Sequence, residues 1–252
     1  MTKDNLIGIF RCDYSLTLKH KYGDFADQSA QVMRNAGYEG DFKVYDVIKS
    51  QYPTEEELAQ LKGIWITGSV DDAFGDVPWI NELCDYLYKL YTTHPGIRIV
   101  GICFGHQIIG RVFGCGVGRN PKGWEFGTYP VEVSKDSDVQ ELFEQVKGSF
   151  KIVEVHQDVV FDIPPGFKSI GSTQLAPVQG LYQRDRVLTF QGHPEFTLAF
   201  LVDLLDARSK AGKFTDEQVK RFETRLIADQ GVEITRVILK FLLETRTNRL
   251  VN

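Results

Sequence analysis

The stretch RIVGICFGHQIIGRVFG, residues 98–114, joins a strand pattern directly to a helix pattern. Bulky apolar residues over 99–102 predict a strand that is covered on both faces, as in a parallel sheet. Apolar residues then recur at helical spacing over 108–113, which predicts an amphipathic helix. The chain must therefore turn sharply near Phe104 and Gly105, and Cys103 stands at the start of that turn.

Two glycines flank this cysteine, in the order Gly101-Ile102-Cys103-Phe104-Gly105. The G-x-nucleophile-x-G pattern relieves crowding around a strained residue whose side chain points into a cleft. The turn also places the thiol at a helix N-terminus, where the partial positive charge favours a thiolate. Most cysteines are instead inert core residues. The pattern predicts a nucleophile, provided that a base lies nearby.

The rest of the chain alternates strand and helix patterns. Apolar stretches over 5–12, 42–47 and 63–69 predict further strands separated by helices, which is typical of an α/β fold with a doubly wound, mostly parallel sheet and flanking helices. No linker, repeat or low-complexity tract interrupts the chain, so we expect one domain over 1–252. Shorter strands are expected over 127–134, 151–161, 167–173 and 178–195, with a hairpin at Arg184-Asp185, and helices over 197–209, 215–230 and 232–246, which form a C-terminal region of 197–246.

The amino-acid composition argues against nucleic-acid binding, membrane association and metal binding. The 252 residues are 42% hydrophobic with a formal net charge of -5, so no basic field favours nucleic acid or anionic lipid. No apolar run is long enough for a secretory signal or a membrane span, and we expect a soluble, cytoplasmic protein. The four cysteines lack C-x-x-C spacing, and the acidic stretch SVDDAFGD (69–76) contains no histidine, so no metal site is expected.

A thiol nucleophile needs a base, and His193 has the best context of the five histidines. The stretch VLTFQGHPEF (187–196) carries it at the end of an apolar strand, where active sites of α/β proteins gather. Glu195 lies two residues further on and can orient the imidazole through a carboxylate. The other histidines fit other roles. We expect His94 in a turn and His20 at the surface, and the ring of His106 on the elbow helix should point away from the thiol. His156 ends a strand and could face the cleft.

These motifs resemble those of the class I glutamine amidotransferases, through GICFGHQ (101–107) and GHPE (192–195). The resemblance runs over about residues 6–196 and implies a flavodoxin-like sheet with Cys103, His193 and Glu195 as a catalytic triad. It also implies that the N–H groups of Gly68 and Phe104 form the oxyanion hole. A loop amide and the amide after an elbow nucleophile are suitably placed for that role on physical grounds.

The resemblance extends to substrate binding. The stretches WEFG (124–127) and VHQD (155–158) match positions that hold the γ-glutamyl group in this family, largely through main-chain contacts. It therefore implies substrate-binding roles for Phe126, His156 and Gln157, and Gln107 is expected to contact the α-amino acid end of the substrate. For Asp158, a turn-stabilising role is the alternative. The implied chemistry requires neither a metal nor an organic cofactor.

Within the family, the chain is most similar to a stand-alone branch that includes the plant γ-glutamyl peptidases, through DDAFGD, GICFGHQII and HQD. The resemblance implies a cysteine-dependent hydrolase of γ-glutamyl peptides such as glutathione or its conjugates. The chain has no P-loop, so a synthetase would be a separate polypeptide. One alternative is thus a glutaminase subunit that delivers ammonia to such a partner. A second is a non-catalytic protein on the same scaffold that senses redox state or stress.

Overall fold

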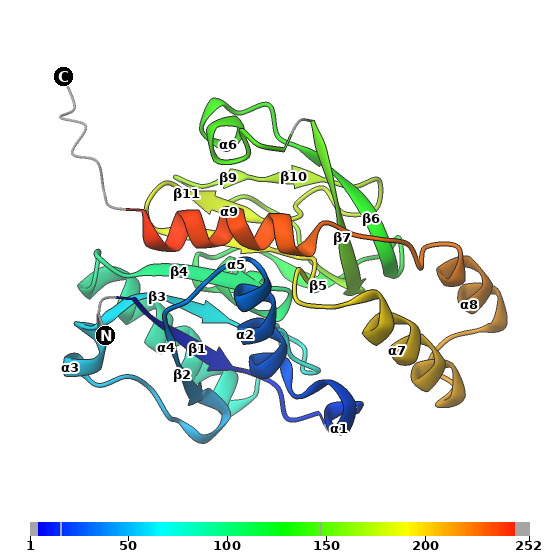
Figure 1. Ribbon diagram of the computed structural model, residues 1–252, viewed down its shortest axis with the longest axis horizontal. Helices are drawn as coiled ribbons and strands as arrows, with labels where there is room; N and C mark the ends of the chain where they lie inside the picture. Colours follow the sequence, from blue (N-terminus) through cyan, green and yellow to red (C-terminus); the bar gives the residue numbers. More distant parts are fainter. Residues whose placement is uncertain (1–4, 16, 147, 245–252) are drawn as a thin grey trace.

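The computed structural model describes residues 5–15, 17–146 and 148–244, and a seven-stranded sheet lies at its centre (Figure 1). Its strands are β1 (Leu6–Arg11), β2 (Asp41–Asp46), β3 (Leu61–Ile66), β4 (Arg98–Ile102), β9 (Lys168–Ser169), β11 (Leu181–Gln183) and β12 (Val187–Phe190). Their spatial order is β2-β1-β3-β4-β12-β11-β9, parallel from β2 to β12 and antiparallel beyond. This is the flavodoxin-like arrangement, so the predicted mostly parallel sheet is confirmed.

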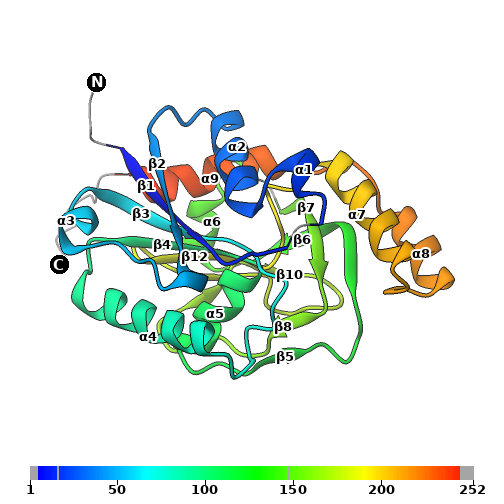
Figure 2. The same cartoon turned by 90° about the horizontal axis from the view of Figure 1, so that it is seen from below.

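Helices cover both faces of this sheet (Figure 2). On one face lie α2 (Phe25–Asn35) and α9 (Gly231–Leu243), and on the other lie α4 (Pro78–Thr93) and α5 (Phe104–Val112). All five residues of β4 are buried, which explains the apolar run that follows Arg98. Among the described residues, no helix combines the length and the apolar character needed to cross a membrane. The short elements are α1 (Lys19–Tyr22), the 3-10 helix η1 (Val47–Lys49), α3 (Glu55–Leu58) and α6 (Ser137–Leu142).

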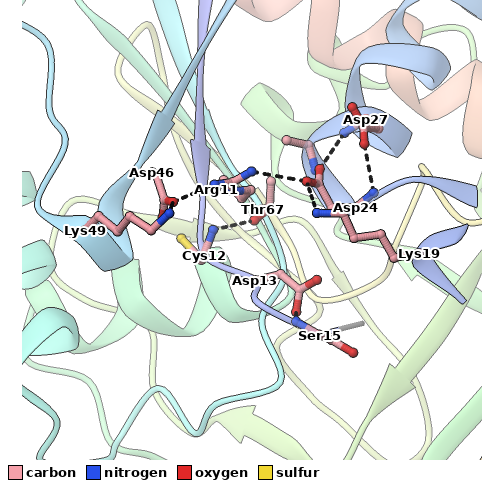
Figure 3. Close-up of polar contacts among 11 residues, drawn as sticks. Arg11, Cys12, Asp13, Ser15, Lys19, Asp24, Asp27, Asp46, Lys49 and Thr67 are labelled. Atoms are coloured by element: carbon pink, nitrogen blue, oxygen red, sulfur yellow. Dashed lines mark hydrogen bonds and ion pairs between the residues drawn. The ribbon is translucent and has the colours of Figure 1, made fainter. Parts of the chain in front are cut away.

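Arg11 connects the carboxyl ends of two strands to a helix (Figure 3). Its guanidinium lies 3.3 Å from a carboxylate oxygen of Asp24 and 2.5 Å from one of Asp46. Asp24 also caps α2, because its carboxylate accepts the N–H groups of Ala26 and Asp27. The ends of β1 and β2 and the start of α2 are thereby fixed to one another at the edge of the sheet where the candidate site lies.

A second, three-stranded sheet packs beside the first. It contains β6 (Glu125–Val133), β7 (Ser149–His156) and β10 (Gly171–Ser172), with β6 and β7 antiparallel over their whole shared length. An isolated antiparallel bridge joins Val153 of β7 to His193, just beyond the end of β12. The segment that carries the predicted base is thus held between the two sheets. A two-stranded sheet of β5 (Val117–Arg119) and β8 (Asp158–Val160) completes the strands among the described residues.

The C-terminal region forms three helices, as expected, but with different bounds. They are α7 (Leu198–Lys210), α8 (Asp216–Glu223) and α9, and residues 245–246 of the expected last helix lie outside the described residues. The expected helix over 215–230 ends early because the carbonyls of Arg225 and Ile227 accept hydrogen bonds from Thr128 of β6 instead. The predicted hairpin at Arg184-Asp185 is confirmed between β11 and β12.

Candidate active site

Cys103 lies at the junction of β4 and α5, with φ of 49° and ψ of -98°. A positive φ is costly for any residue with a Cβ, and such strain concentrates at functional positions. The turn therefore falls on Cys103 itself and not, as expected, on Phe104 and Gly105, which already belong to the helix. The structure confirms the predicted strand, elbow and helix.

The glycines on either side of Cys103 are required by close packing. A Cβ at Gly101 would lie 2.6 Å from the carbonyl carbon and oxygen of Gly105, and one at Gly105 would lie 2.7 Å from the carbonyl oxygen of Ile66. Contacts with backbone atoms at these distances cannot be relieved by moving a side chain. The elbow consequently depends on glycine at both positions, as the sequence pattern predicts.

The electrostatics of the thiol differ from the expectation. Burial raises the pKa of Cys103, the carboxylates of Glu154 and Glu195 raise it further, and the Phe104 N–H acts in the opposite direction. The expected stabilisation of a thiolate by the helix N-terminus is outweighed, because a charge without its water shell is costly. The raised pKa favours the neutral thiol, so a nucleophilic role of Cys103 would require a base that removes its proton.

His193 is held rigidly at the end of β12. Its backbone N–H donates to the carbonyl of Val153 at 2.7 Å, and its Nδ1 lies 2.8 Å from Oε1 of Glu195. The ring of Phe196 stacks on the imidazole with centroids 3.9 Å apart and an interplanar angle of 4°. The carboxylate occupies Nδ1, so Nε2 is the nitrogen left for proton transfer. The structure thus pairs the predicted base with the predicted orienting group.

The loop after β3 places Gly68 beside this base. A Cβ at Gly68 would lie 2.9 Å from Cε1 of His193. The hydroxyl of Thr67 donates to the Gly68 carbonyl at 2.9 Å and accepts the Cys12 N–H at 3.0 Å, which ties the loop to the end of β1 (Figure 3). Gly68 adjoins His193, and Phe104 follows Cys103 directly. The oxyanion role of their N–H groups remains a prediction.

Cys103 and His193 both line a pocket of about 490 Å³. One side comes from Ser69, Val70, Asp72 and Arg119, and further lining comes from α7 and the segment before α8. Two arginines and a lysine face this space, although the chain as a whole is acidic. The aromatic and charged lining residues beyond the first side are Phe25, Trp124, Phe196, Phe200, Arg208, Lys213 and Phe214.

Arg119 fixes the acidic loop against the pocket. Its guanidinium pairs with Asp72 at 2.9 Å and with Asp158 at 2.7 Å. Burial raises the pKa of Asp158 to about 6, while Arg119 acts to lower it. The alternative role expected for Asp158, stabilising a turn by itself, is thus replaced by an ion pair that joins β8 to the loop over residues 69–76.

The four residues expected to bind substrate do not line this pocket, as far as the described residues go. Gln107 is buried and its amide donates to the Asp158 carbonyl and to the side chain of Gln191, each at 3.1 Å. Phe126 is fully buried among aromatic rings, and Gln157 accepts the Asn120 N–H through its carbonyl at 2.8 Å. None of these three side chains lines the pocket, and main-chain contacts with substrate remain a prediction.

His156, the fourth of these residues, lies in a closed cluster with two carboxylates. Its Nε2 is 3.1 Å from Glu125 and 3.2 Å from Glu154, and all three side chains are buried. Burial alone would lower the pKa of His156, but the two carboxylates outweigh it and raise that pKa to about 10. Burial also raises the pKa of Glu154 to about 7. The expectation that His156 could face the cleft is wrong, because β7 directs it into the wall.

His106 is not placed to act as a base on Cys103, because it is buried away from the pocket. Its Nδ1 shares a hydrogen bond of 2.8 Å with Thr189 Oγ1, and burial lowers its pKa to about 3. As expected from its position on the elbow helix, it does not line the pocket. Among the described residues that do, His193 is the sole histidine.

Two polar residues near the thiol were missed by the sequence analysis. The amide of Gln191 lies 3.5 Å from Cys103 Sγ, and Arg208 of α7 lines the pocket. Gln191 directly precedes the GHPE motif at a strand end, which is a usable signal. Arg208 lies four residues after Leu204 on the apolar side of a predicted helix, but only the docking of α7 shows what that side faces.

Residues 22–200 match the glutamine amidotransferase class-I family. The chain belongs to this family. Other members of the family match most of the length of this chain. A glutamine amidotransferase-like protein of Schizosaccharomyces pombe is 32% identical over 251 residues, covering 96% of this chain and 100% of the relative.

A second relative and a solved structure extend the comparison. Gamma-glutamyl peptidase 3 of Arabidopsis thaliana is 34% identical to this family member over 198 residues, covering 77% of this chain and 78% of the relative. The crystal structure of a glutamine amidotransferase from Thermotoga maritima superposes with a TM-score of 0.72 at 18% identity, covering 95% of this chain and 99% of the other. That structural likeness supports the fold alone.

Proposed function

We propose that the protein is a cysteine-dependent hydrolase of γ-glutamyl amide bonds, with γ-glutamyl peptides such as glutathione or its conjugates as substrates. The observation that carries this proposal is the pocket of about 490 Å³ that contains both Cys103 and His193. This volume exceeds what a glutamine side chain with an ammonia leaving group needs, and it falls within the range of small-molecule sites. The relationship to a plant γ-glutamyl peptidase supports the same substrate class.

In the proposed acylation, Nε2 of His193 takes the proton from Cys103 and the sulfur attacks the γ-carbonyl carbon. The carbonyl π electrons move to oxygen, and the N–H groups of Gly68 and Phe104 stabilise the resulting oxyanion. When the tetrahedral intermediate collapses, the C–N bond breaks and the imidazolium gives its proton to the departing amine. A γ-glutamyl thioester remains on Cys103.

Deacylation uses the same groups with water as the nucleophile. His193 removes a proton from water, the hydroxide attacks the thioester carbonyl, and the C–S bond breaks as the tetrahedral intermediate collapses. The sulfur leaves as a thiolate and takes the proton back from the imidazolium. Glutamate is released and the neutral thiol is restored, which agrees with the raised pKa of Cys103 in the free protein.

The test is a comparison of glutamate release from glutathione, a glutathione S-conjugate and glutamine by the purified chain. We expect kcat/KM to be higher for the two peptides than for glutamine, and Cys103→Ser to abolish all three reactions. Cys115→Ser is the matched control, since Cys115 lies outside the pocket and should be dispensable.

Two other results would reject this proposal in favour of an alternative function. Glutamine hydrolysis that begins only when a second protein is added, with no peptide hydrolysis, would establish the glutaminase subunit. Reversible oxidation of Cys103 without any hydrolysis would establish the non-catalytic sensor. Absence of a metal or organic cofactor requirement is expected and is checked by assaying the protein after dialysis against a chelator.

A further inference from the structure

Arg208 is a half-buried cation that forms no ion pair with the residues that the structure describes. It lies on α7 and lines the pocket together with Cys103. Its Nη1 is inaccessible to solvent and has no hydrogen-bond partner among the described residues. A buried donor atom without a hydrogen-bond partner costs free energy, so a native structure retains one only where something compensates for it.

Its situation contrasts with that of the other pocket arginine. Arg119 already binds the carboxylates of Asp72 and Asp158, so its charge is neutralised within the protein. Lys213, on the same side as Arg208, is exposed to solvent, which compensates its charge. The guanidinium of Arg208 is therefore the pocket cation best placed to receive a charged group from a ligand.

Two aromatic rings hold this guanidinium in place. It lies over the ring of Trp124 at 5.6 Å and over that of Phe126 at 5.8 Å. Cation–π contacts of this kind orient the planar group without using its N–H donors. The side chain is thus positioned in advance, which reduces the entropy lost when a ligand binds.

The guanidinium of Arg208 determines which chemical group of a ligand it can bind. A guanidinium presents paired N–H groups that match the two oxygens of a carboxylate. A γ-glutamyl peptide has two carboxylates: the α-carboxylate of the glutamyl group and the C-terminal carboxylate of the leaving peptide. Either would place a negative charge beside Arg208 while the γ-carbonyl is at Cys103.

We propose that Arg208 binds a carboxylate of the γ-glutamyl substrate and makes the pocket selective for anionic peptides. The proposal rests on the function proposed above, because it takes its ligand from that reaction. It assigns to α7 a direct part in substrate recognition, in addition to its packing against the aromatic cluster around Phe200 and Phe214.

The test measures binding to a protein that cannot turn over its ligand. Glutathione is titrated calorimetrically into Cys103→Ser and into the double variant that also carries Arg208→Gln. We expect the second substitution to weaken binding about 10- to 100-fold, as for the loss of a charge-assisted hydrogen bond. Arg208→Lys, which keeps the charge without the paired donors, should recover part of that affinity.

Arg221→Gln in the same Cys103→Ser background is the matched control. Arg221 is exposed on α8, lies over the ring of Phe222 and does not line the pocket, so its removal changes the net charge equally. Its binding constant for glutathione should equal that of the parent. Equal affinities of the Arg208→Gln variant and the parent, or a loss no larger than that of the control, would overturn the proposal.

A second ligand identifies the carboxylate. In glutathione glycinamide the C-terminal carboxylate is blocked and the α-carboxylate is intact. If Arg208 binds the α-carboxylate, Arg208→Gln weakens both ligands by the same factor. If it binds the C-terminal carboxylate, the glycinamide binds weakly to the parent and loses nothing further.

The binding experiment separates this proposal from the proposed function. Arg208-dependent binding in a protein whose wild type hydrolyses no γ-glutamyl peptide would reject the hydrolase function alone. Hydrolysis by the wild type with Arg208-independent binding would reject the role of Arg208 alone. No binding of glutathione to Cys103→Ser, under conditions where the wild type is also inactive, would reject both.

Discussion

Within the described part of the chain, two buried histidine–carboxylate clusters lie close in space but differ in access and charge. His193 has one carboxylate partner, Glu195, and lines the pocket. His156 lies between Glu125 and Glu154 and is enclosed in the wall. Both contain an imidazole and carboxylates, so composition alone does not separate them.

The difference shows what makes a histidine suitable as a base. Two carboxylates around one imidazole raise the pKa of His156 to about 10, and the ring therefore retains its proton at neutral pH. With a single carboxylate on Nδ1, the other nitrogen of His193 is available to the thiol or a water molecule. The number of carboxylates and the open side of the ring thus distinguish a structural histidine from a candidate base.

The largest expected effect comes from substituting each of the two histidines in turn. His193→Ala should reduce kcat/KM for a γ-glutamyl peptide on the order of 10⁴-fold or more, because the thiol would lose its base. His156→Gln should reduce it far less per folded molecule. Glutamate release, normalised to the folded fraction from circular dichroism, provides the measurement. Similar losses in both variants would show that the two clusters do not differ in role.

Glu195→Gln should have a smaller effect, about 10²- to 10³-fold in kcat/KM, because an orienting group is partly replaceable whereas the nucleophile and base are not. Glutamine keeps the size of the side chain but removes the charge opposite Nδ1. The same assay checks this, with Cys103→Ser and His193→Ala as references. An equal loss in all three variants would contradict the orienting role.

His156→Gln should lower stability by about 3 kcal/mol, because it leaves two buried carboxylates without their cation. The raised folded-state pKa of His156, about 10 against an ordinary 6.5, means that its stabilising effect is complete below pH 6.5 and disappears as pH rises through 10. Urea unfolding at pH 8, 9 and 10, all above the pKa of Glu154, should show a stability difference from wild type that shrinks in that order. A constant difference would argue against a protonated His156.

The smallest expected effect concerns the position of His193. Gly68→Ala should lower kcat about 10- to 30-fold by displacing the imidazole, since the new Cβ would lie 2.9 Å from its Cε1. Gly96→Ala is the matched control, because a Cβ there meets nothing within 4 Å. Unchanged kcat in the Gly68 variant would mean that the ring tolerates displacement.

The parts of the site that the sequence predicts are those encoded over a few neighbouring residues. The elbow around Cys103 shows in a change of hydrophobic period between two glycines, and the His193–Glu195 pair spans one turn. Their local geometry is fixed by the residues between them. For this reason the strand, the elbow and the His193–Glu195 pair are predictable from the sequence alone.

The sequence-based predictions are wrong or incomplete where a side chain's surroundings come from distant segments of the chain. A helix N-terminus predicts a thiolate at Cys103, but Glu154 from another sheet and the surrounding burial reverse the effect. The direction of His156 depends on the pairing of β6 with β7, and the exposure of Arg208 to the pocket depends on how α7 docks. Neither sequence periodicity nor spacing contains this information.

The bond from the His193 N–H to the Val153 carbonyl joins the segment after β12 to the second sheet. Opening this contact would loosen the segment that carries His193 without unfolding either sheet, and sub-global openings of this kind are visible in amide hydrogen exchange. The exchange rate of the His193 amide proton therefore reports how often the segment after β12 separates from β7. A ligand that spans the pocket should slow this exchange more than it slows exchange in the interior of β4.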